Sequence, residues 1–192
     1  GNYSGIAQLV LGDRYKIGFT YVNSYSGSDT TNGQRAFLLG GVGTSFANSP
    51  WTAAGLSSPV PIVTNAYGIE TSLQFTDNLI LNGWVGKMDS RLIGIGDADI
   101  WTFNANLGLL DIGTEGSVLG FAFGAEPTLR GIESSTATSF TRDWAYHLEG
   151  FYKYKLNKNI SLTPGLIWLP NINQNSSNED VFIGTLRTTF TF

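Results

Sequence analysis

The 192-residue chain contains no cysteine, a single histidine (His147) and a single methionine (Met88). Without cysteine the chain has no disulfide framework and no thiol nucleophile, and one histidine cannot build a zinc site from Cys and His ligands. His147 is also the sole candidate base for a Ser-His-acid hydrolase, and no Gly-x-Ser-x-Gly elbow accompanies it. The sequence therefore predicts a protein that is not an enzyme, with no cofactor and no metal site.

Charge and long apolar runs are scarce as well. Charged residues make up 14% of the chain and the formal net charge is −4, which argues against nucleic acid as a partner. No stretch approaches 18 apolar residues, so a transmembrane helix is not expected. Aromatic residues nevertheless reach 13% and glycines number 24. Low charge with many aromatics and no apolar helix is typical of a membrane β-barrel, which spreads its apolar band over alternating residues.

Alternation with a period of two dominates the chain. In residues 14–21 the odd positions are aromatic or apolar and the even positions are polar or glycine, as in a strand with one oily and one polar face. Several such segments match the roughly 9–11 residues that a tilted strand needs to cross a bilayer. The prediction is an all-β, antiparallel transmembrane β-barrel. Nine strands are expected, at residues 3–11, 14–22, 63–75, 79–88, 98–109, 117–125, 143–156, 160–169 and 181–192.

The expected connections alternate between short and long. Short turns at 12–13, 76–78, 110–116 and 157–159 alternate with longer loops at about 23–62, 89–97, 126–142 and 170–180. Outer-membrane barrels have short periplasmic turns and long external loops, so Phe192 is expected on the periplasmic side and Gly1 outside. An odd number of strands does not close such a barrel. We therefore expect residues 1–192 to be the C-terminal portion of a longer barrel, the alternative being a strand missed inside 34–46.

Four segments carry a family resemblance. They are Asp97-Ala98-Asp99-Ile100-Trp101, His147-Leu148-Glu149-Gly150-Phe151-Tyr152, Asn159-Ile160-Ser161-Leu162-Thr163-Pro164-Gly165-Leu166 and the closing Gly184-Thr185-Leu186-Arg187-Thr188-Thr189-Phe190-Thr191-Phe192. Together they resemble the C-terminal half of cyanobacterial outer-membrane porins, the iron-uptake porins related to the carbohydrate-selective porin family. The resemblance implies a wide barrel of about sixteen strands, as in porins generally, that assembles as a homotrimer. It also implies an upstream segment, outside this sequence, that binds the cell wall.

The residues expected to line the pore follow from the alternation. Basic side chains outnumber acidic ones on the polar face, while most other acids are expected in turns or loops. A basic wall favours anions and acidic loops attract cations, so ion preference stays open. The candidate pore-lining residues are Arg14, Lys16, Glu70, Asn104, Asn106, His147, Glu149, Lys153, Lys155 and Arg187.

Two further features bear on transport and assembly. The connection at about 23–62 is long enough to suggest a functional segment that folds into the channel, with Asp29 and Arg35 as constriction candidates, or else an external lid or trimer latch. Trp144 with Tyr146, and Tyr152 with Tyr154, are expected near opposite ends of one strand as aromatic girdles. The apolar residues Leu186, Phe190 and Phe192 resemble the signal that the barrel-assembly machinery reads by strand addition.

The leading hypothesis is an outer-membrane channel for passive diffusion of inorganic ions, including iron species, and small solutes. A carbohydrate-selective porin is the alternative within transport. A structural protein that anchors the outer membrane to the cell wall is the alternative of another class, and a ligand-binding barrel outside the membrane is the last. The expected partners are outer-membrane lipid, two further copies of the protein, the barrel-assembly machinery and, through the upstream region, the cell wall.

Overall fold

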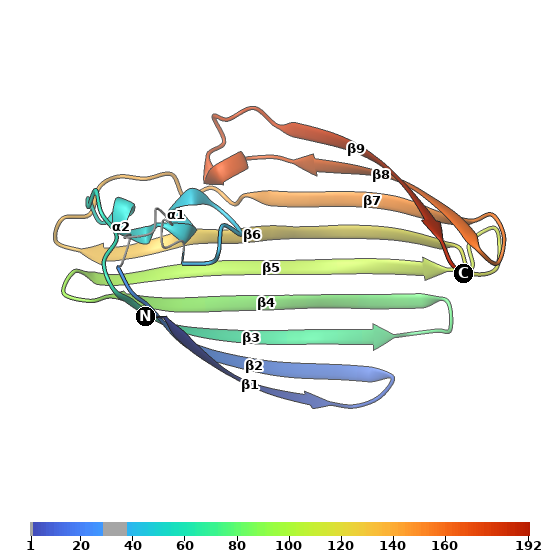
Figure 1. Ribbon diagram of the computed structural model, residues 1–192, viewed down its shortest axis with the longest axis horizontal. Coiled ribbons are helices and arrows are strands. Elements are labelled where there is room, and N and C mark those ends of the chain that lie inside the picture. The colour runs from blue at the N-terminus through green and yellow to red at the C-terminus, as the bar shows by residue number, and fades with distance from the viewer. Residues whose placement is uncertain (1, 29–37) are drawn as a thin grey trace.

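A computed structural model describes residues 2–28 and 38–192 and places them in a single curved antiparallel sheet (Figure 1). Each strand pairs with its neighbours in the sequence, so the order in the sheet is β1 to β9. In these described residues nine strands occur: β1 (Tyr3–Leu11), β2 (Tyr15–Ser26), β3 (Ile62–Gln74), β4 (Leu79–Leu92), β5 (Gly96–Leu110), β6 (Val118–Ser134), β7 (Tyr146–Lys155), β8 (Ile160–Leu169) and β9 (Val181–Phe190). Three short helices lie in the connections: α1 (Ser45–Asn48), α2 (Pro50–Ala53) and η1 (Ile172–Gln174).

The predicted all-β fold is confirmed, and so are all the predicted strands. The bounds of β1 and β8 agree with the prediction, while β9 ends at Phe190 and leaves Phe192 fully exposed beyond it. Two predicted loops are wrong. The expected loop at 89–97 is mostly strand, because β4 and β5 are joined by residues 93–95 alone, and the expected loop at 126–142 starts only after Ser134.

A β-bulge explains the second error. Trp101 pairs with Thr128 and Phe103 pairs with Ala125, so two residues of β6, Glu126 and Pro127, stand opposite the single residue Thr102. Proline cannot donate to a strand ladder and interrupts the alternation, which made the sequence read as a loop although the strand resumes beyond it. The described part of the connection after β2, residues 27–28 and 38–61, contains helix and turn and no strand.

The two ends of the sheet differ. The connections after β1, β3, β5 and β7 gather at one end, called here the turn end, and those after β2, β4, β6 and β8 gather at the other, the loop end (Figure 1). The connections after β2, β6 and β8 are longer than any at the turn end, whereas the connection after β4, residues 93–95, is short. Among the described helices none is long and apolar enough to cross a membrane, a finding that concerns helices alone.

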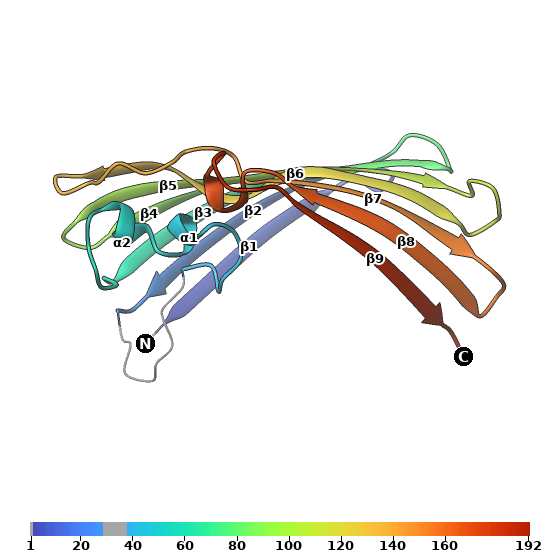
Figure 2. The same cartoon turned by 90° about the horizontal axis from the view of Figure 1, so that it is seen from above.

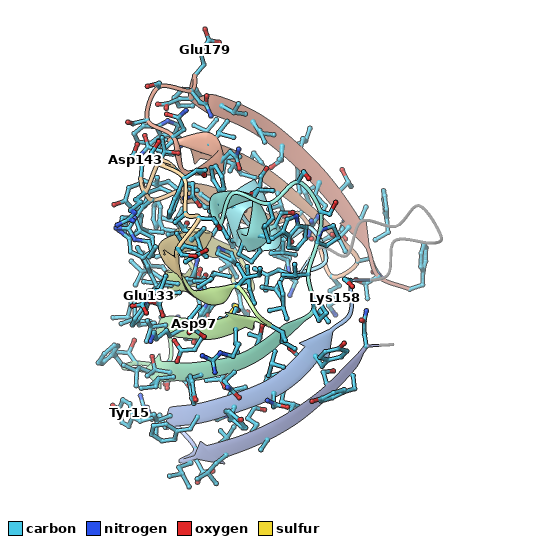
Figure 3. The ribbon with its side chains drawn as sticks, turned by 90° about the vertical axis from the view of Figure 1, so that its left-hand side faces the viewer. Tyr15, Asp97, Glu133, Asp143, Lys158 and Glu179 are labelled. Atoms are coloured by element: carbon cyan, nitrogen blue, oxygen red, sulfur yellow. The ribbon has the colours of Figure 1, made fainter. Side chains whose placement is uncertain are left out.

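The sheet is bent into an arch with α1 and α2 on its concave side (Figure 2). Cross-strand register assigns every strand residue to one face or the other, because directly paired residues point the same way. The convex face carries a band of large apolar residues, such as Phe121, Leu148 and Leu166, along rows that register joins. The concave face carries glycine, amide, hydroxyl and charged side chains over most of its area. The view along the strands from the loop end shows the helices inside the arch and Tyr15 on its convex side (Figure 3).

A small hydrophobic core fills the loop end of the concave face. Residues 38–61, called here the inner segment, contribute Trp51 and three alanines of α1, α2 and the residue after α2, all buried. They pack on buried apolar residues of β3 to β6: Ile62, Leu92, Ala98, Ile100 and Leu129. Burial of an Ile or Leu side chain contributes about 1.5–3 kcal/mol, so this core holds the inner segment on the wall.

Candidate functional site

Two adjacent rows of polar residues cross the concave face below the inner segment. The first row runs from Glu70 on β3 through Trp84, Asn104 and Gly124 to His147 on β7, each residue paired directly with the next. The second row joins Lys16, Ser72, Asn82, Asn106, Ala122 and Glu149 in the same way. Gly124 lies directly beside Asn104, where a Cβ atom would stand 2.9 Å from Asn104 Nδ2, so the glycine makes room for the amide.

A hydrogen-bond network fixes the Glu70 carboxylate. Its Oε1 accepts from Gln8 Nε2 at 2.7 Å and from the Thr20 hydroxyl at 2.6 Å. Gly18 lies directly opposite, where a Cβ atom would stand 2.6 Å from Glu70 Cγ, so the glycine makes room for the acid. A negative charge is thereby held on the concave face by neighbours from β1 and β2.

Trp84 is the large aromatic side chain of these rows. Nearly half of it (48%) is exposed, between Glu70 on one side and Asn104 on the other. Within the described part of the chain, Asn104 Oδ1 is buried and has no hydrogen-bond partner. A cavity borders this group and is lined by Trp84, Thr102, Phe103, Asn104, Gly124, Ala125, Glu126, Pro127 and His147. The arrangement offers a flat apolar ring next to hydrogen-bonding groups.

His147 also has a partner of its own. Its Nε2 lies 3.2 Å from Glu149 Oε2, and the two side chains project from the same face of β7. In the described residues no group of three or more His, Cys, Asp and Glu side chains is arranged to hold a metal ion.

Basic side chains gather on the concave face toward the turn end. Lys16 follows the first turn, and Lys153 and Lys155 end β7. Arg187 on β9 pairs with Thr163 and shares this face. Arg14 differs from the expectation, because it lies in the turn before β2 and not on the wall. Its guanidinium donates to the backbone oxygens of Gln74 and Phe75, which ties two turns together.

The described part of the long connection after β2 lies inside the arch, where α1 and α2 cover the loop end of the rows (Figure 2). Thr44 N donates to Pro127 O at 3.0 Å, and Thr138 N donates to Ala53 O at 2.9 Å. Gly43 has φ +86° and approaches β6 so closely that a Cβ atom would stand 2.6 Å from Pro127 O. The two constriction candidates, Asp29 and Arg35, lie outside the described residues.

The convex face has aromatic clusters at both ends of β7. Trp144 packs on Phe103 with ring centroids 5.2 Å apart, and Tyr146 stacks on Phe123 at 5.7 Å. Toward the turn end Tyr152 and Tyr154 pack together at 6.1 Å. The assembly-signal residues Leu186 and Phe190 are exposed on the same face of β9.

The sequence analysis did not predict several residues of the concave face, and it placed some acids in loops that lie in strands. Trp84 was not among the predicted pore-lining residues, although it lies two positions from Asn82 and therefore shares its face, which was a usable signal. Gln8 and Thr20 gave no signal, because their role depends on pairing with β3. The acids Asp89, Asp97, Glu126 and Glu133 were expected in loops, and all four lie within strands.

Comparison with known proteins identifies a family whose description fits a β-sheet with one apolar and one polar face. The family described as "Carbohydrate-selective porin, OprB family" matches residues 12–192. An uncharacterized protein of Nostoc sp. is 38% identical over 199 residues, covering 100% of this chain and 32% of that protein. An uncharacterized protein of Synechocystis sp. is 29% identical over 212 residues, covering 100% of this chain and 37% of that protein. The chain thus spans about a third of the length of these curated relatives, and no solved structure matches it significantly.

Proposed function

This chain belongs to the carbohydrate-selective porin OprB family, and on that premise we propose that it forms part of the wall of an outer-membrane channel for small carbohydrates. The convex apolar band suits contact with lipid, and the concave polar rows suit contact with water. The chain spans about a third of its relatives, so the remaining strands of the barrel and a trimeric assembly belong to the proposal.

The single observation that carries the substrate class is the position of Trp84. A sugar ring has an apolar face of C–H groups and a rim of hydroxyls, so its recognition needs a flat apolar surface beside hydrogen-bonding groups. Trp84 supplies an exposed ring, and the Glu70 carboxylate and the Asn104 amide flank it directly in the register. A carboxylate accepts from hydroxyls, while an amide both donates and accepts. An uncharged sugar gains from this arrangement more than an inorganic ion does.

The prediction of an ion channel that admits iron species stays a prediction. The four basic residues of the concave face, Lys16, Lys153, Lys155 and Arg187, favour anions electrostatically, and small ions accompany water through any wide polar pore. For orientation we propose that the turn end is periplasmic, because outer-membrane barrels keep their short turns on that side. Insertion by the barrel-assembly machinery and attachment to the cell wall through upstream residues complete the proposal.

The test uses the full-length protein in a planar bilayer. Wild-type protein should conduct, and added sugar should reduce the current as sugar molecules occupy the pore. Trp84→Ala should keep the conductance and raise the sugar concentration that halves the current. Trp168→Ala is the matched control, because Trp168 stacks on Phe182 on the convex face and lies away from the polar rows. If the wild-type protein conducts and added sugar does not reduce its current, the result would contradict the carbohydrate proposal and favour the ion channel.

A further inference from the structure

We propose that Gln174 is a positioning residue that locks the inner segment onto the wall and thereby sets the bore of the channel. The proposal rests on the proposed function, since a bore has meaning only for a channel. Its structural part, the lock itself, concerns the contact between two connections that lie 130 residues apart in the sequence.

The lock begins with a strand edge that its neighbour does not cover. β6 runs to Ser134, but its pairing with β7 covers only Val118 to Ala125. The part of β6 beyond the bulge therefore has no β7 residue to pair with. A free strand edge exposes unpaired N–H and C=O groups that need another partner, and burial makes an unpaired group costly.

The Gln174 side chain takes the place of the missing strand. It is fully buried (0% exposed), and its amide pairs with both backbone groups of Leu129. Leu129 N donates to Gln174 Oε1 at 3.1 Å, and Gln174 Nε2 donates to Leu129 O at 3.1 Å. The same Nε2 also donates to Thr141 O in the connection after β6.

The amide then reaches the inner segment. Thr44 Oγ1 donates to Gln174 Oε1 at 2.6 Å and accepts from Ala47 N at 3.2 Å, so Thr44 both caps α1 and joins it to the lock. Next to it, Ser45 N donates to Asn173 Oδ1 at 2.6 Å. Figures 1 and 2 show η1 beside α1 at the loop end. One buried amide therefore joins β6, the connection after β6 and the inner segment.

The backbone around Gln174 is held in an unusual conformation. Asn171, Asn173 and Gln174 have φ values of 55°, 58° and 54°, in the left-handed region that residues other than glycine seldom adopt. Such conformations persist where surrounding contacts over-determine them, and they cluster at positions with a specific role. Here they direct the Asn173 and Gln174 side chains toward α1 and β6.

The experiment combines a thiol probe with conductance in the full-length protein. Ala47 lies in α1 of the inner segment and is fully buried against the wall, and these 192 residues contain no cysteine, so Ala47→Cys reports whether the segment stays in place. In that background, Gln174→Leu should raise the rate of thiol labelling at least about tenfold, equivalent to about 1.4 kcal/mol. Without the probe, Gln174→Leu should increase single-channel conductance and open-channel noise. Ser177→Ala, an exposed position in the same connection, should match wild type in both measurements.

A second pair of variants keeps the test decisive if Gln174→Leu fails to fold. Thr44→Val leaves the pairing of Gln174 with Leu129 intact and removes the hydroxyl that joins the inner segment to it. Thr44→Val should raise labelling and noise, and Thr44→Ser should restore wild-type values. Unchanged labelling in folded Gln174→Leu or Thr44→Val protein would overturn the lock. Increased labelling without any change in conductance would overturn its control of the bore, and a wild type that does not conduct would contradict the proposed function while the labelling still tests the lock.

Discussion

Asp89 on β4 and Asp99 on β5 lie directly opposite each other on the convex face, with Lys87 Nζ 2.6 Å from the first carboxylate and 3.4 Å from the second. Arg91 and Asp97 form a further ion pair one row closer to the loop end, at 3.1 Å. Charged groups avoid the hydrocarbon of a bilayer, so these rows mark where the convex face leaves the apolar band. In the proposed channel the loop ends of β4 to β6 then extend beyond the membrane.

Removing the cation between the two acids should destabilise this part of the sheet. Lys87→Met leaves two like charges directly opposite each other, an arrangement that costs up to about 1 kcal/mol. The Lys87 side chain is 36% exposed, so solvent screening keeps the effect at or below that value. Urea unfolding of the detergent-refolded protein measures it. Asp99→Asn in the Lys87→Met background should recover most of the loss, and an unchanged double variant would argue against charge repulsion as the cause.

The assignment of the two faces predicts opposite responses to the same substitution. Phe121→Arg places a charge in the convex band and should cost about 2–4 kcal/mol near the bilayer midplane. Asn106 is next to Leu107, the residue of β5 that pairs with Phe121, and its side chain lies on the concave face. Asn106→Arg should therefore cost far less, because its side chain meets water. Refolding into lipid vesicles with urea titration compares the two. Equal losses would mean that the faces are assigned wrongly.

The basic residues at the turn end should influence the ions that pass. Lys153 and Lys155 share the concave face of β7 about 7 Å apart, at roughly 3.3 Å per residue. This spacing lies within the 8–10 Å screening length of physiological salt, so both charges act on the same ion. Changing both to Glu should shift the reversal potential under a salt gradient toward cation preference, and the shift should shrink at high salt. Arg14→Glu serves as the comparison, since Arg14 is engaged by the turn, and it should shift the potential less.

The contact between Asp143 and Ser176 should respond to acid. Ser176 lowers the pKa of the Asp143 carboxyl below its ordinary value, through its side chain first and then through its backbone N–H, which donates to Oδ2 at 2.8 Å. Because the folded pKa is depressed, the contact's contribution is present above the ordinary pKa and is lost as the pH falls through the lowered value. Ser176→Ala keeps the backbone donor and loses the hydroxyl, so the NMR titration midpoint of Asp143 should move up toward the ordinary value. A midpoint that stays in place would assign the shift to the backbone alone.

Strands were predictable wherever one face meets apolar surroundings and the other meets water. That condition holds along residues 160–166 of β8, whose bounds agree with the prediction, whereas β1 carries Ile6 and Val10 on its concave face. At the loop end of β4 to β6 the two faces exchange character: Leu92 and Ile100 point inward to the core, while Asp89 and Asp97 point outward. The alternation continues there with its phase reversed, and the sequence reading took the acids for loop residues.

The candidate site was less predictable than the fold. The concave positions of Glu70, Asn104 and Glu149 followed from alternation, which is a local property. The roles of Trp84 and Gln174 depend on which residues of other strands stand beside them, and that pairing is decided over long distances in the chain. No local pattern marks the fully buried amide of Gln174, since it lies in a polar connection whose other residues are all half-buried or exposed.

Apolar side chains of this chain are buried in two different ways, because the small core under the inner segment is covered by protein and the convex band is not. Phe121 and its neighbours on the convex band lose contact with water only when acyl chains cover them. Trp51, Ile100 and Leu129 find their partners within the protein, as residues do in an ordinary globular core. Burial of these residues therefore needs no acyl chains, so the loop end has a driving force for folding that does not depend on a bilayer. This core joins four adjacent strands, β3 to β6, through contacts within the protein, whereas burial of the convex band depends on what surrounds the sheet.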